Sequence, residues 1–138
     1  MSRPQDPDVE DRGTAPGLRL HQASCHCGAV RFRFLSHIEE VVQCNCSYCV
    51  RKGALHHRID ARHFELLAGA RALNLYRFGT LRATHFFCRL CGTHTHCHPR
   101  SAPAQINVNV RCVEDVHLWL ATVRVRDHDG RAWALDTA

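Results

Sequence analysis

Seven cysteines fall into three short groups along the chain, and their spacing constrains the fold more than any other feature. The groups are Cys25 with Cys27, then Cys44, Cys46 and Cys49, then Cys88 with Cys91. The 138 residues contain 9 cysteines, and an odd number cannot be fully paired by disulfides within one chain. Residues 1–17 lack the apolar segment of a secretory signal peptide. Cysteines this closely spaced, with no export signal, are typical of metal sites rather than of disulfides.

The two outer pairs together make one complete set of zinc ligands. Cys88 and Cys91 are followed by Gly92, and a Cys-x-x-Cys-Gly turn brings two thiolates to one ion. Cys25 and Cys27 can do the same at the end of a strand. The central triple is then left without an obvious fourth ligand. Either a ligand comes from elsewhere in the chain, or the fourth position is open for chemistry.

The remaining cysteines and the histidines give weaker signals. Cys97 and Cys112 stand alone in the sequence, which favours small buried residues over ligands. A redox-active Cys88/Cys91 pair is disfavoured because the βαβ context of thioredoxin-like motifs is missing. Several of the 12 histidines are candidates for a fourth ligand, although a structural role is favoured for each. They are His56, His57, His85, His94, His96 and His98.

Alternating hydrophobicity predicts an all-β domain with minimal helix. Val30, Phe32 and Phe34 alternate with arginines, which gives a strand one apolar face. Similar or shorter extended segments are expected at 18–21, 38–42, 64–67, 73–77, 84–87 and 106–110, with one helical turn at 61–64. We expect a single domain over residues 18–134, a flexible arm over 1–17 and a tail over 135–138.

The charge pattern excludes some classes of partner. The chain has 18 basic and 13 acidic residues, a net charge of +5 with neutral histidines, and Lys52 is the single lysine. The arginines are scattered rather than clustered, which makes nucleic-acid binding unlikely but suits a small anionic substrate. No apolar stretch reaches the ~20 residues of a membrane helix. The sequence therefore indicates a cytoplasmic protein with no membrane partner.

Taken in order, the cysteine groups resemble those of the glutathione-dependent formaldehyde-activating enzyme family, which shares a domain with centromere protein V. The resemblance rests on the segments 25–30, 44–54, 87–92 and 107–112, and covers about residues 18–114. It implies a β-tent of short antiparallel strands held together by zinc, with two zinc ions per chain. It assigns Cys25, Cys27, Cys88 and Cys91 to a structural zinc, and Cys44, Cys46 and Cys49 to a catalytic one.

The resemblance also implies carbon–sulfur lyase chemistry, in which glutathione and formaldehyde form S-(hydroxymethyl)glutathione. Substrate-side residues are hypotheses from charge and position. Guanidinium and ammonium groups suit the carboxylates of glutathione, and amide side chains suit its peptide bonds. The candidates are Arg51, Lys52, Arg111, Asn107 and Asn109, with His56 as a candidate proton shuttle.

A non-enzymatic reading stays open beside the enzyme. Domains of the β-tent type also occur as protein-binding modules, either chaperones of small GTPases or relatives of centromere protein V. Such a zinc-stabilised module would need the four-cysteine clip but not the triple, so the triple favours the enzyme. A relationship to methionine sulfoxide reductase is disfavoured because the first pair is Cys-x-Cys rather than Cys-x-x-Cys.

Overall fold

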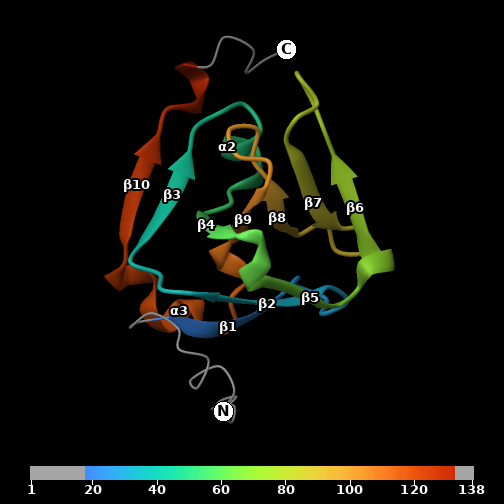
Figure 1. Ribbon diagram of the computed structural model, residues 1–138, viewed down its shortest axis with the longest axis vertical. Helices are drawn as coiled ribbons and strands as arrows, with labels where there is room; N and C mark the ends of the chain where they lie inside the picture. The colour runs from blue at the N-terminus through green and yellow to red at the C-terminus, as the bar shows by residue number, and fades with distance from the viewer. Residues whose placement is uncertain (1–17, 133–138) are drawn as a thin grey trace.

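The computed structural model describes residues 18–132, and β-strands account for most of their regular structure (Figure 1). The strands are β1 Arg19–Ser24, β2 Arg31–Ser36, β3 Glu40–Cys44, β4 His56–Asp60, β5 Phe64–Ala68, β6 Leu73–Tyr76, β7 Thr84–Cys88, β8 His94–His98, β9 Gln105–Asn109 and β10 Arg124–His128. The helices are α2 Cys49–Lys52 and α3 Val116–Trp119, with 3₁₀ turns η1 Ala61–His63, η2 Ala70–Ala72, η3 Val110–Cys112, η4 Leu120–Thr122 and η5 Gly130–Ala132. The expected all-β class is confirmed.

Two sheets build the expected β-tent. A three-stranded sheet has the order β1-β2-β5, and a seven-stranded sheet has the order β10-β3-β4-β9-β8-β7-β6. Figure 1 shows β10 and β3 as one slope, β7 and β6 as the other, and the small sheet across the base. No helix among residues 18–132 is long and apolar enough to cross a membrane.

The core lies where the small sheet faces the inner strands of the large one. Phe32 and Phe34 of β2 are completely buried, as the alternation of β2 predicts. Phe32 stacks on Phe34 and on Phe64 of β5, and contacts the His96 ring at a centroid distance of 6.0 Å. From the large sheet, Val41, Ile59, Ile106 and Val108 complete the cluster.

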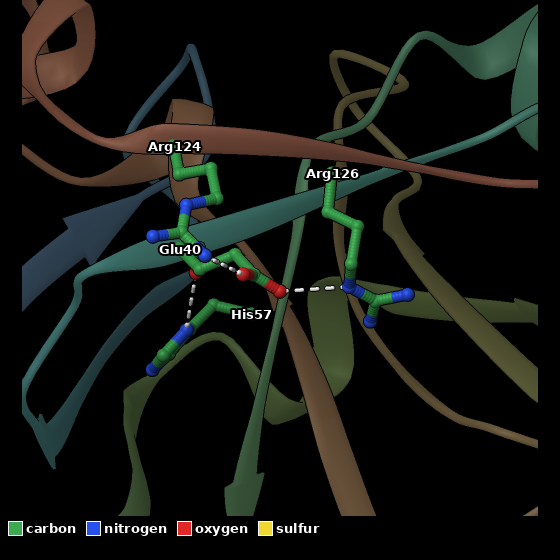
Figure 2. A network of polar contacts seen from close by, with 4 residues as sticks. All are labelled: Glu40, His57, Arg124 and Arg126. Carbon is green, nitrogen blue, oxygen red and sulfur yellow. Dashed lines mark hydrogen bonds and ion pairs between the residues drawn. The ribbon is translucent and has the colours of Figure 1, made fainter.

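The last strand joins the large sheet by backbone pairing with β3 and by ion pairs to Glu40. β10 pairs in parallel with β3, so one strand pair departs from the antiparallel pattern expected from the resemblance. Arg126 Nε lies 2.7 Å from one oxygen of Glu40, and Arg124 lies 3.6 Å from the other (Figure 2). His57 Nδ1 lies 3.2 Å from the Glu40 carbonyl oxygen, which links β4 to the same residue.

Three strands lie outside the segments expected from the sequence: β8, and also β4 and β10, which lack an apolar alternation. The side chains of β10 are exposed throughout, and β4 begins with two histidines and an arginine. Both strands are specified by their neighbours in the sheet rather than by their own sequence. The turn expected at 61–64 is confirmed as η1. The expected arm over 1–17 and tail over 135–138 lie outside the described residues.

Replacing Phe32 by alanine is expected to lower the free energy of unfolding by about 3–5 kcal/mol, because it leaves a cavity between the sheets. Urea denaturation followed by circular dichroism measures the change. The matched control is Leu118→Ala, where the side chain is 72% exposed and the change should stay within about 0.5 kcal/mol. A Phe32→Ala protein as stable as the control would contradict the assigned core.

Candidate metal centres

Four cysteines meet where the turn after β1 approaches the turn after β7. Cys27 Sγ lies 3.7 Å from Cys25 Sγ and 3.7 Å from Cys88 Sγ. Cys91 completes a group in which all four sulfurs lie within 4.8 Å of one another. These separations exclude disulfides, whose sulfur atoms lie about 2.05 Å apart. The cysteine pairs that the sequence predicted as one set are therefore brought together.

The donor set and its spacing fit a tetrahedral metal ion. Sulfurs placed 2.3 Å from a central zinc lie about 3.8 Å from one another, close to the separations in this group. The turns also direct backbone donors at the sulfurs, since Val30 N–H donates to Cys25 Sγ over 3.3 Å. The four-cysteine group can therefore hold zinc and would connect the small sheet to the large one.

The second group, which we call the cysteine triple, is built at the end of β3. Cys44 is the last residue of β3, and Cys49 begins α2. The three sulfurs lie within 4.8 Å of one another. Cys46 N–H donates to Cys44 Sγ over 3.4 Å, and Cys49 N–H donates to Cys46 Sγ over 3.2 Å. The bend between strand and helix thus turns the three side chains inward and supplies their thiolates with donors.

The three thiols do not ionise alike. Hydrogen bonds from the Cys44 and Cys49 thiols hold the pKa of Cys46 well below its usual range. The same sulfur contacts raise the pKa values of Cys44 and Cys49. Without a cation the triple therefore favours one thiolate flanked by two thiols. A bound metal ion would supply the positive charge that ionises all three.

The chain after β10 closes over the back of the cysteine triple. Asn45, between the first two cysteines, donates to the Asp129 carboxylate over 3.1 Å and accepts from Arg131 N–H over 3.2 Å. A Cβ added to Gly130 would lie 2.7 Å from Cys44 Sγ, which is too close for a real contact. Gly130 is therefore required for this close approach. The family resemblance extends weakly to Asp129, Gly130 and Arg131, but the sequence did not assign Gly130 a role at this site.

Lys52 is the one predicted substrate-side residue that points into the buried side of this region. Its Nζ lies 3.1 Å from His85 Nδ1 and 3.3 Å from His94 Nε2. It also lies 4.5 Å from the centroid of the Tyr48 ring. Burial lowers the Lys52 pKa, while the neighbouring thiols Cys49 and Cys97 act in the opposite direction. The Lys52 ammonium is thus held near the cysteine triple by contacts with the rings of His85, His94 and Tyr48.

The other predicted substrate-side residues make contacts outside the cysteine triple or within the fold. Arg51 donates to the Ser47 carbonyl over 2.6 Å on the exposed side of α2. Asn107 accepts from Arg58 over 3.1 Å. Asn109 accepts from the backbone of Leu55 and Arg111 and donates to the His94 carbonyl. Arg111 itself is exposed on η3.

Buried histidines surround Lys52. His56 Nε2 lies 3.4 Å from Cys49 Sγ, so the candidate proton shuttle does lie beside the cysteine triple. Burial, with Lys52 as a second cause, lowers the pKa of His56 to about 3 and that of His85 to about 3. His56 also groups with His94 and Cys97, whose ligand atoms lie within 4.8 Å of one another. The sequence did not predict this third group.

Comparison with known proteins places the chain among relatives. The family model described as glutathione-dependent formaldehyde-activating enzyme matches residues 20–127. A crystal structure of a Rhodobacter sphaeroides protein, a structural genomics target, is 38% identical with a TM-score of 0.68. The match covers 75% of this chain and 98% of that one. The cysteines of both proposed metal centres lie within the matched residues. The chain therefore belongs to the glutathione-dependent formaldehyde-activating enzyme family.

Proposed function

We propose that the protein is a zinc-dependent carbon–sulfur lyase that forms S-(hydroxymethyl)glutathione from glutathione and formaldehyde. The observation that carries the proposal is the cysteine triple, a three-sulfur group with Lys52 and buried histidines beside it. The four-cysteine group would hold a structural zinc. We place the reaction in the cytoplasm, where thiols are kept reduced.

The two cysteine groups differ in charge and in coordination. Four thiolates satisfy zinc completely and leave it a poor Lewis acid. Zinc held by Cys44, Cys46 and Cys49 would keep one position at which an incoming thiol binds as its thiolate. Such an ion would supply an activated thiol, and a glutathione thiolate held beside Lys52 would be the nucleophile that attacks the carbonyl carbon of formaldehyde. A carbon–sulfur bond forms, and the carbonyl oxygen takes up the proton that the thiol has lost.

Lys52 is the best-placed residue to stabilise the charge that develops on the aldehyde oxygen. An ammonium has three N–H donors, and two of them are directed at His85 Nδ1 and His94 Nε2. The third is available for an oxygen atom. The two imidazoles fix the direction of the ammonium, and the buried surroundings strengthen its electrostatic effect. His56 is a poorer candidate for the proton donor, because its pKa of about 3 leaves the ring neutral near pH 7.

Changing Cys46 to serine is expected to remove one equivalent of zinc and the glutathione-dependent consumption of formaldehyde, while the fold stays intact. Zinc analysis, circular dichroism and an assay of free formaldehyde give the three readouts. Cys112→Ser is the matched control, because Cys112 is equally buried but belongs to neither cysteine group. Full activity in a Cys46→Ser protein that has lost its zinc would contradict the role proposed for the cysteine triple. Absence of activity in the wild type would favour the binding-module alternative.

Gly130→Ala is expected to weaken zinc binding at the cysteine triple and leave the four-cysteine group loaded. The new methyl group would meet Cys44 Sγ and the Cys46 side chain at 2.7 Å, so the triple must shift. Competition with a chelator separates the two sites, because the perturbed site loses its zinc at lower chelator concentration. The four-cysteine zinc is the internal control. A Gly130→Ala protein with wild-type chelator resistance would show that this contact does not shape the site.

Lys52→Met is expected to lower kcat by roughly 10²-fold, the usual effect of removing one donor to a developing oxyanion. The matched control is Arg51→Met, a neighbouring cation on the exposed side of α2, for which a small effect is expected. Steady-state kinetics at saturating glutathione measures both. Equal losses in the two variants, appearing in KM alone, would assign Lys52 to glutathione binding instead.

A further inference from the structure

A third group of ligand side chains adjoins the cysteine triple, since His56 Nε2 lies 3.4 Å from Cys49 Sγ. One ring nitrogen of His56, one of His94 and the Cys97 sulfur all lie within 4.8 Å of one another. The residues come from β4 and β8 and are only 5%, 6% and 3% exposed. Neither the four-cysteine site nor the cysteine triple requires them as ligands. Three donors of these types, buried together, need an explanation of their own.

The histidine rings leave two polar atoms unused. Within residues 18–132, His56 Nδ1 and His94 Nδ1 are buried and have no hydrogen-bond partner. The other nitrogen of each ring is engaged, His56 Nε2 with Cys49 Sγ and His94 Nε2 with Lys52 Nζ. Leaving a buried polar atom unpaired costs about 1–3 kcal/mol. An ion bound through Nδ1 of both rings would satisfy these two atoms at once.

The donor set indicates the chemical class of that ligand. Two imidazole nitrogens and one thiolate suit late first-row transition ions, zinc and copper among them. Zinc bonds of 2.0–2.1 Å to nitrogen and 2.3 Å to sulfur place ligand atoms about 3.3–3.8 Å apart. The present separations are within 4.8 Å, so side-chain shifts of about 1 Å would close the group around an ion.

We propose that His56, His94 and Cys97 form a third metal site, which takes a late first-row ion such as zinc or copper.

Lys52 affects how firmly this site binds its ion, and His56 links the site to the cysteine triple. An ion bound at His94 Nδ1 would move the ring proton to Nε2, so the hydrogen bond from the Lys52 ammonium to His94 Nε2 would be lost when the site fills. The Lys52 ammonium also opposes a nearby cation, whereas the Cys97 sulfur, once ionised by the metal, offsets that repulsion. The site therefore binds its ion less firmly than the four-cysteine group does. His56 contacts Cys49 of the triple through Nε2, so an ion in the third site lies one imidazole away from the triple.

The test counts metal ions on the full chain. Metal-free protein is titrated with Zn²⁺ alone and, separately, with Cu⁺ alone, followed by elemental analysis after desalting. Wild type is expected to bind one equivalent more than His94→Ala or Cys97→Ser. His98→Ala and Cys112→Ser are the matched controls and should bind as wild type does, since neither residue belongs to the three-residue group. Equal equivalents in wild type and both site variants would overturn the proposal.

Cobalt(II) titration of the wild type gives a second readout that needs no variant to fold. The equivalent bound at the third site should add charge-transfer absorption of one thiolate, about a third of that added by the cysteine triple. Absence of such an equivalent overturns the proposal. Comparing Cys46→Ser with Cys97→Ser distinguishes the two proposals. If Cys46→Ser binds one ion fewer than wild type and Cys97→Ser binds as many, the enzyme site is supported and the third site is contradicted. If Cys97→Ser loses an ion and Cys46→Ser does not, the third site is supported and the catalytic zinc site is contradicted.

Discussion

The meeting of four sulfurs between two turns is the contact on which the rest of the structure depends. One turn leaves β1 of the small sheet and the other leaves β7 of the large sheet, and the sulfurs of Cys27 and Cys88 approach to 3.7 Å. Few apolar residues lie nearby: the local cluster has Cys25, Val30 and Cys88 as its buried members. A small β domain with so little apolar material at this junction relies on its sulfurs there, as metal-stabilised domains do.

The cysteine triple depends on a different part of the chain, the last strand and its continuation. Arg124 and Arg126 hold β10 against Glu40 of β3, and Asp129 then reaches Asn45 between the first two cysteines. Exposed ion pairs contribute at most about 1 kcal/mol each. The segment that packs on the cysteine triple is therefore held by individually weak side-chain contacts in addition to the backbone pairing of β10 with β3. In the four-cysteine group, Cys25 and Cys88 are buried, Cys91 is half-buried and Cys27 is exposed.

Sequence alone predicted features that depend on short segments of the chain, and it missed contacts between residues that are far apart in the sequence. The cysteine spacings and the alternation of β2 are local, and both predictions agree with the structure. The direction of the Lys52 side chain depends on distant residues, because its partners His85 and His94 are 33 and 42 residues away in the sequence. The close approach of Gly130 to Cys44 has the same origin. Long-range pairing through the large sheet decides these contacts, and a single sequence does not contain it.

The position of Lys52 follows from the charges that surround it. The cysteine triple concentrates negative charge at the end of β3 when its thiols ionise, and a buried thiolate needs a compensating cation. An arginine fork with five donors would be difficult to satisfy among imidazole rings, whereas an ammonium can donate to two ring nitrogens and keep one donor. Lys52 is the single lysine among 18 basic residues. Its chemistry, rather than its charge alone, therefore explains why this position departs from the arginine used elsewhere in the chain.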